Sequence, residues 1–126
     1  MSLTPHGPGF SFLDSIEIES NQAHGKKWLD PASPYFADHF PGNPLMPGAL
    51  LIECAAQAAG ALWRQPQAFL AGVQQFRFLK PVLPGQTVEI EVALEKDFGA
   101  LAQFDVMLSV AGTTVAQGKL TMSQKL

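Results

Sequence analysis

The feature that most constrains the fold is a long apolar stretch between Pro47 and Trp63. Pro47 suits the first turn of a helix, where its missing backbone N–H would have no intrahelical acceptor. The stretch is apolar on nearly every side, and only Glu53 and Gln57 interrupt it, so the rest of the chain must surround the helix. It is also too short to span a bilayer. The sequence therefore predicts one central, buried helix over about 47–63.

The segments after this helix have the pattern of antiparallel strands. An aromatic and aliphatic run covers 68–78, and apolar residues then alternate with mostly polar ones over 87–95 and 102–110. A last strand is expected over 115–122, after a hairpin at Gly112. Four meandering strands after one buried helix predict an α+β domain, in which an antiparallel sheet curls round the helix.

Shorter signals complete this arrangement. Two strands are expected over 16–19 and 23–29, the first with Ile16 and Ile18 on a buried face. The sequence Leu83-Pro-Gly-Gln suits a type II turn with Gly85 at the position that needs a positive φ. Exposed edge strands on such a sheet favour pairing between two copies, so a homodimer is expected.

Length and composition restrict the kind of protein. The chain has 126 residues, which suits a single domain over 1–126. Its net charge of −3, without lysines or arginines clustered among aromatic residues, argues against nucleic-acid binding. Cys54 is the only cysteine, so no intrachain disulfide can form, which fits a reducing cytoplasm. The N-terminus lacks the segments of a signal peptide, and we expect a cytoplasmic protein without membrane insertion.

No cofactor or metal is expected. The sequence carries neither a phosphate-binding loop nor a glycine-rich dinucleotide fingerprint. Its histidines, acids and Cys54 do not have the spacing of metal ligands. Cys54 is expected to be a small buried hydrophobe rather than a nucleophile, because no basic partner adjoins it on the helix.

His39 is the first candidate for chemistry. Residues 31–47 hold five prolines and are expected to be a loop with at most one helical turn near 34–38. A histidine in a loop is more often a surface or hydrogen-bonding residue. The run Phe40-Pro-Gly-Asn-Pro, however, stiffens the loop and would fix the ring, as general-base catalysis requires. His6 and His24 lack such a setting and are interpreted as structural.

Glu53 is the second candidate. A lone acid in an apolar helix is costly unless it is paired or functional. Gln57 follows one turn later on the same face and could hydrogen-bond the carboxylate and orient it. The alternative is a structural Glu53, either at the surface of the helix or buried against a partner such as Arg64 or Arg77.

Gly48 is the third candidate. It lies at the expected start of the helix, where its amide N–H has no intrahelical acceptor. A thioester carbonyl docked there would meet both a hydrogen bond and the positive end of the helix dipole. The alternative is that Gly48 only permits close packing or a tight turn.

These residues belong to a longer resemblance, which covers most of the chain. The run His39-Phe-Pro-Gly, continued by Met46-Pro-Gly-Ala-Leu and Glu53-Cys-Ala-Ala-Gln57, closely resembles the signature of the 3-hydroxyacyl-acyl-carrier-protein dehydratases. These are small enzymes of the hot-dog fold. The family's second signature is matched by Phe69-Leu-Ala-Gly-Val, which is followed by Arg77-Phe78 and Pro81-Val-Leu-Pro-Gly85.

The resemblance implies an activity and a role for each candidate. The family dehydrates (3R)-hydroxyacyl thioesters to trans-2-enoyl thioesters. The resemblance implies that His39 is the base, that Glu53 assists the departing hydroxyl, and that the Gly48 amide holds the thioester carbonyl. It also implies a site at a dimer interface, with the histidine from one subunit and the glutamate from the other.

The resemblance further implies a substrate on a phosphopantetheine arm, and the sequence does not decide between an acyl carrier protein and coenzyme A. The expected substrate contacts are Gly48, Gln57, Phe40, Leu45 and Met46. Arg77 and Lys80, near the second signature, are expected to dock an acidic carrier protein. A homodimer is expected, with a trimer of such dimers as an alternative.

Two departures from the family pattern bear on the pathway. Asp38 stands where the family often has glycine, and Gln74-Gln-Phe76 replaces a lysine-containing segment. These departures suit a relative that serves a secondary lipid, polyene or polyketide pathway. Two other functions stay open: a hot-dog thioesterase, in which Glu53 activates water, and a non-catalytic subunit that binds acyl carriers.

Overall fold

The computed structural model describes residues 13–32, 48–65 and 67–124 of the chain. Its elements, in chain order, are β1 (Ser15–Glu19), β2 (Gln22–Trp28), α2 (Gly48–Trp63), β3 (Phe69–Phe78), β4 (Thr87–Asp97), β5 (Leu101–Val110) and β6 (Thr113–Ser123). These bounds lie close to the predicted ones. The helical turn expected near 34–38 lies outside the described residues.

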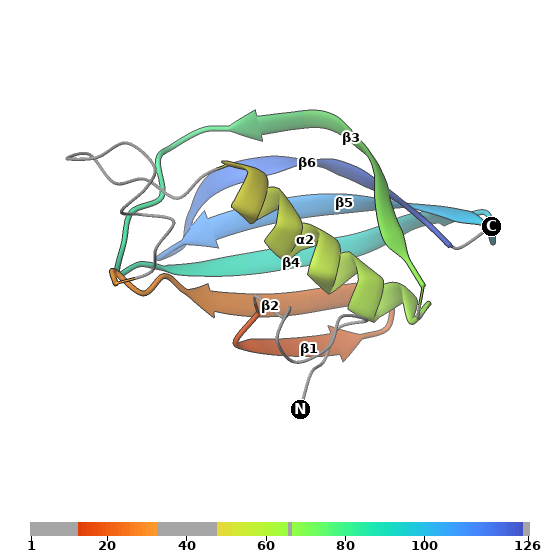
Figure 1. Cartoon of the computed structure of the whole chain (residues 1–126), viewed down its shortest axis with the longest axis horizontal. Coiled ribbons are helices and arrows are strands. Elements are labelled where there is room, and N and C mark those ends of the chain that lie inside the picture. The colour runs from red at the N-terminus through yellow and green to blue at the C-terminus, as the bar shows by residue number, and fades with distance from the viewer. Residues whose placement is uncertain (1–12, 33–47, 66, 125–126) are drawn as a thin grey trace.

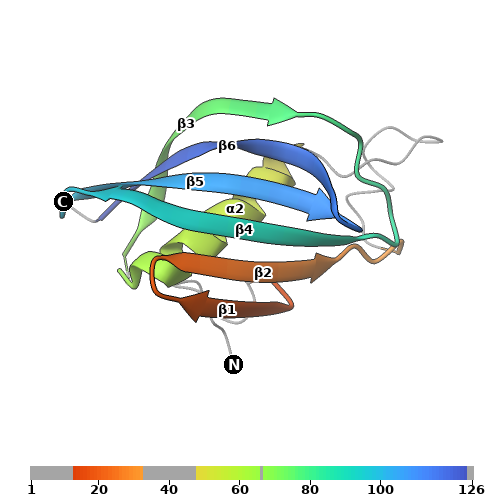
Figure 2. The same cartoon turned by 180° about the vertical axis from the view of Figure 1, so that it is seen from behind.

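The strands form one six-stranded sheet in the order β1-β2-β4-β5-β6-β3, with every neighbouring pair antiparallel. Figure 1 shows the sheet curving round α2, which crosses its concave face, and Figure 2 shows the convex face from behind. This is the predicted α+β arrangement of a helix wrapped by an antiparallel sheet.

The core lies between the helix and the concave face. Every residue of α2 from Cys54 to Trp63 is buried. On β4 and β5 alternate side chains point to the helix, as the period of two predicts, and the buried ones include Ile90, Phe104 and Leu108. The Trp63 ring meets Phe104 edge-on, with centroids 6.3 Å apart. Its Nε1–H donates a hydrogen bond of 3.1 Å to Asp97 Oδ2, which fixes the end of the helix to β4.

The prediction of a four-strand meander is wrong for β3. Only β4, β5 and β6 follow one another as neighbours, whereas β3 pairs with β6 at the far edge of the sheet. The segment 79–86 therefore crosses the end of the sheet to reach β4. Two backbone hydrogen bonds hold it there: Leu29 N–H donates to Gln86 O at 2.9 Å, and Gly85 N–H donates to Leu29 O at 2.6 Å.

The prediction for β1 is right in extent and wrong for one side chain. Ile16 packs against the core, but Ile18 is 47% exposed. The reason is that β1 is an edge strand, and only part of it lies beside the buried layer. The predicted turns are confirmed: Gly85 has a φ of 86°, and Gly112, in the β5–β6 hairpin, has a φ of 82°.

Candidate active site

Glu53 and Gln57 meet on the helix as predicted. Gln57 Nε2 donates a hydrogen bond of 3.2 Å to Glu53 Oε2. Gln57 is only 1% exposed, while Glu53 is partly buried. Because the amide is held in the core, it fixes the direction of the carboxylate. Arg77 faces the convex side, beside Gln117, so the sheet separates it from the helix and argues against the alternative Glu53–Arg77 pair.

Gly48 begins α2 and has a close neighbour in β3. A Cβ added to Gly48 would lie 2.9 Å from Cζ of Phe78 and 3.1 to 3.3 Å from two other ring atoms. Real Cβ atoms do not approach so closely, so any larger residue would displace the ring. Gly48 thus permits close packing of α2 against Phe78. The same residue keeps an N–H in the first turn, where no intrahelical acceptor exists.

Cys54 is not a nucleophile. Its side chain is 1% exposed, and burial raises the pKa of the thiol to about 12. The thiol therefore stays protonated at neutral pH, and protonated thiols are poor nucleophiles. The prediction of a small buried hydrophobe is confirmed.

Several predicted site residues lie outside the described residues. They are His39, Phe40, Leu45 and Met46, together with His6 and Asp38. His24 is described, and its Nε2 lies 2.9 Å from Glu89 Oε1 on the convex face. This contact supports the structural interpretation of His24.

The two predicted docking residues are both exposed near the end of β3. Arg77 lines a shallow hollow of about 370 Å³ on the convex face, which it shares with Asp105 and Lys119. Lys119 contacts Asp105 Oδ1 at 2.6 Å and Glu95 Oε2 at 3.1 Å. These hydrogen bonds, first that to Asp105, raise the pKa of Lys119. Its charge is thus already paired, and Arg77 supplies most of the positive charge in this hollow.

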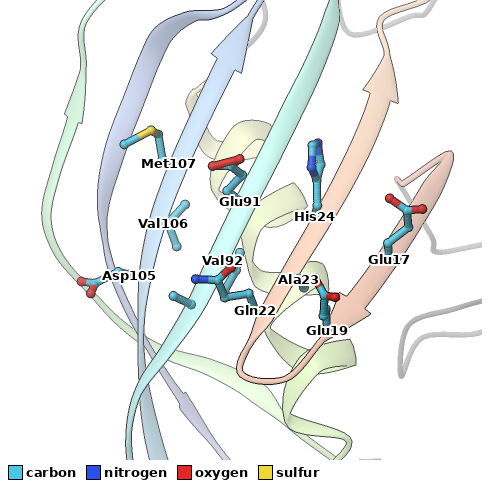
Figure 3. Close-up of a pocket in the computed structure, with 11 residues that line it drawn as sticks. Glu17, Glu19, Gln22, Ala23, His24, Glu91, Val92, Asp105, Val106 and Met107 are labelled. Atoms are coloured by element: carbon cyan, nitrogen blue, oxygen red, sulfur yellow. The ribbon is translucent and has the colours of Figure 1, made fainter.

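A second hollow was not predicted from the sequence. It has a volume of about 420 Å³ and lies on the convex face of β1, β2, β4 and β5. Figure 3 shows Glu17, Glu19 and Glu91 around it, with His24 between them. The signal was the alternation of glutamates with apolar residues in β1 and β4. The part of the convex face around this hollow is acidic, in contrast to the part around Arg77.

Neither a metal site nor a membrane-spanning helix is found in the part of the chain that the structure describes. Over 13–32, 48–65 and 67–124, no three His, Cys, Asp or Glu side chains come together in a way that could hold a metal ion. Within the same ranges, no helix is long and apolar enough to cross a membrane.

Curated relatives share most of this chain. The ApeI-like family, described as ApeI dehydratase, matches residues 15–119. The chain is 39% identical to the 3-hydroxyacyl-[acyl-carrier-protein] dehydratase FabZ of Herpetosiphon aurantiacus, over 95% of this chain and 91% of the relative. It is also 39% identical to the FabZ of Rhizobium rhizogenes, over 95% of this chain and 82% of that relative.

A solved structure has the same fold. It is titled the dehydratase heterocomplex ApeI:P from Xenorhabdus doucetiae, and its TM-score to this chain is 0.82 at 20% sequence identity. The match covers 98% of this chain and 89% of that one. The helix-borne acid, the wrapped sheet and the relatives over nearly the whole length agree: the chain belongs to the 3-hydroxyacyl-[acyl-carrier-protein] dehydratase family.

Proposed function

We propose that the protein catalyses the dehydration of (3R)-hydroxyacyl thioesters to trans-2-enoyl thioesters. One observation carries the proposal: a carboxylate, Glu53, is oriented by Gln57 on a helix that begins at Gly48, in a chain of a dehydratase family. Elimination next to a thioester needs a proton donor for the hydroxyl and a hydrogen-bond donor for the carbonyl. Glu53 and the Gly48 amide supply these two groups.

The reaction assigns a step to each group. His39, whose role rests on the family signature, removes the proton from the carbon next to the thioester carbonyl. Negative charge moves to the thioester oxygen, where the Gly48 N–H and the helix dipole stabilise it. The bond between carbon 3 and its hydroxyl then breaks, Glu53 in its carboxylic acid form gives that hydroxyl a proton, and water leaves as the double bond between carbons 2 and 3 forms. One turnover leaves the removed proton on His39 and a carboxylate at Glu53, and proton exchange with water restores both groups.

The substrate is carried on phosphopantetheine, and the names of the FabZ relatives favour an acyl carrier protein over coenzyme A. Phe40, Leu45 and Met46, with the buried Gln57, line the acyl site in this proposal. Acyl carriers are acidic, so docking uses the positive side of the molecule at Arg77 and Lys80 rather than the acidic side at β1 and β2. The pathway is fatty-acid, polyene or polyketide biosynthesis in the cytoplasm.

The active unit is a homodimer formed along β3. This strand is an edge of the sheet, and it carries the exposed apolar side chain of Val73 near its middle. Unpaired strand edges with apolar side chains favour pairing with another chain. The ApeI structure is titled as a heterocomplex, so the second candidate for this edge is a different chain rather than a second copy.

The activity is tested by incubating the purified protein with 3-hydroxyacyl and saturated acyl thioesters. Enoyl absorbance and free thiol are followed separately. Dehydration gives enoyl absorbance without thiol release, and His39→Ala lowers its rate by at least about a hundredfold. Thiol release from both substrates would instead indicate a thioesterase. Binding without either product would indicate a non-catalytic subunit.

The shared site is tested with mixed dimers. His39→Ala and Glu53→Ala proteins are unfolded together, refolded as an equal mixture, and checked for mixed dimers by mass. If the two residues come from different subunits, each mixed dimer has one intact site, and about a quarter of wild-type activity returns. If both come from one chain, every site keeps a lesion and no activity returns.

A further inference from the structure

The C-terminal half of β3 contains a β-bulge. Gln74 pairs with Lys119 and Arg77 pairs with Gln117, so two residues of β3 lie opposite the single residue Gly118. The extra residue is accommodated at Gln75, which has a φ of 54°. A bulge of this kind bends a strand and redirects the side chains that follow it.

The bulge decides which way the aromatic residues face. Val73 pairs with the buried Leu120, and Phe78 pairs with the buried Ala116, so both lie on the helix side of the sheet. These two residues are five apart, and strict alternation would put them on opposite faces. The extra residue at the bulge therefore turns Phe78 toward the helix, since a slip of one residue exchanges the two faces.

A chain of close contacts then fixes the Phe78 ring. Phe76 lies on Gly118, where an added Cβ would come within 2.6 Å of the Phe76 Cα. The rings of Phe76 and Phe78 are 5.3 Å apart between centroids and tilted by 45°. Phe78 in turn lies over Gly48 at the start of α2. Figure 1 shows the end of β3 beside this end of the helix.

We propose that Phe78 is a substrate-positioning residue, whose ring forms one wall of the place where the thioester carbonyl meets the Gly48 amide. The inference rests on the proposed function. The ring contacts Gly48 on one side but is still 51% exposed, so it has surface left for a ligand. A carbonyl bound by the amide would lie beside this ring. The ring also keeps water from the amide, which strengthens the hydrogen bond to a carbonyl.

The chain offers a matched control. Phe69 is in the same strand and is 49% exposed, but it lies at the opposite end of β3, beside Ser123. Phe78→Ala and Phe69→Ala therefore remove similar side chains with similar exposure. Phe78→Leu keeps an apolar wall and serves as the conservative variant if Phe78→Ala does not fold.

The experiment makes two kinds of measurement on the full-length protein. The first is the Kd of an unreactive acyl-pantetheine amide, and the second is kcat and KM for a 3-hydroxyacyl pantetheine thioester. Phe78→Ala is expected to weaken binding of the acyl-pantetheine amide at least tenfold and to raise KM similarly, while Phe78→Leu recovers part of the loss. Phe69→Ala is expected to stay within twofold of the wild type. Equal values for Phe78→Ala and Phe69→Ala would overturn the inference.

A double variant separates positioning from packing. Gly48→Ala should lower the melting temperature through its contact with Phe78, and Phe78→Ala should restore it in the same chain. This double variant should still bind the acyl-pantetheine amide weakly, whereas full recovery of that binding would overturn the inference. Wild-type protein that binds the amide but forms no enoyl product would contradict the proposed function alone. Wild-type protein that does neither would contradict both.

Discussion

Strands β5 and β3 belong to one sheet but differ in regularity. In β5 the buried residues alternate strictly with more exposed ones from Ala102 to Leu108. In β3 no residue is buried, the register shifts twice, and Gln75 takes a left-handed conformation. The regular strand packs the core. The irregular strand aims an aromatic ring at the helix start and leaves apolar surface exposed at the sheet edge. We therefore expect stability to reside in the central strands and function in β3 and the start of α2.

The largest expected effect is on stability, at Phe104 in β5. This side chain is fully buried and meets Trp63 edge-on. Phe104→Ala should lower the free energy of unfolding by about 3–5 kcal/mol through the cavity that it leaves. Denaturant unfolding measures this loss, with Phe69→Ala as the control. The kcat of the protein that remains folded should stay within about threefold of the wild-type value. A much lower kcat would mean that β5 contributes to catalysis as well as to stability.

The next effect is on activity, at Glu53. Glu53→Gln should lower kcat by at least about a hundredfold, because an amide cannot protonate the leaving hydroxyl. Stability should be unchanged or higher, since the new carbonyl oxygen can still accept the hydrogen bond from Gln57 and no ionisable group is left in the apolar helix. Melting temperature and steady-state kinetics check the two halves of this prediction. A marked fall in melting temperature would mean that Glu53 is structural.

A third variant tests the bulge directly. Gln75→Val should lower the free energy of unfolding by about 1–2 kcal/mol, because a β-branched residue fits poorly at a φ of 54°. It should also raise KM, since the bulge directs Phe78. Gln75→Gly is the matched control and should keep both stability and KM, because glycine adopts positive φ without strain. If Gln75→Val and Gln75→Gly have the same stability and the same KM, the bulge does not position Phe78.

The last effect concerns Cys54, and it is absent at neutral pH and appears only above pH 9. Its thiol pKa is raised from 9.0 to about 12 in the folded protein. Above pH 9 the unfolded chain loses the thiol proton while the folded protein keeps it, so the free energy of unfolding should fall with rising pH. The contribution is about 1.4 kcal/mol per pH unit until the folded thiol also ionises. Urea titrations of wild type and Cys54→Ala between pH 8 and about 11 should diverge by this slope.

Local patterns predicted what depends on neighbours in the sequence. The period of two located β4 and β5, and the spacing of four residues placed Gln57 against Glu53. The position of β3 was missed because alternation does not say which edge of a sheet a strand joins. The bulge did leave a signal: apolar residues recur after three positions at Val73 and Phe76, and then after two at Phe78. The contact of Phe78 with Gly48 joins distant segments, and no local pattern encodes it.

The crossover described for β3 also bears on how the chain folds. β4, β5 and β6 are joined by short turns and can pair soon after collapse, whereas β3 must pair with β6 across the whole length of the meander. Contacts between distant parts of a chain form slowly because loop closure costs entropy before they are made. We expect β3 to dock last during folding and its amides to exchange hydrogen fastest among the strands that contact the helix. The contact between the aromatic wall and the helix start is then one of the last to assemble and one of the first to open.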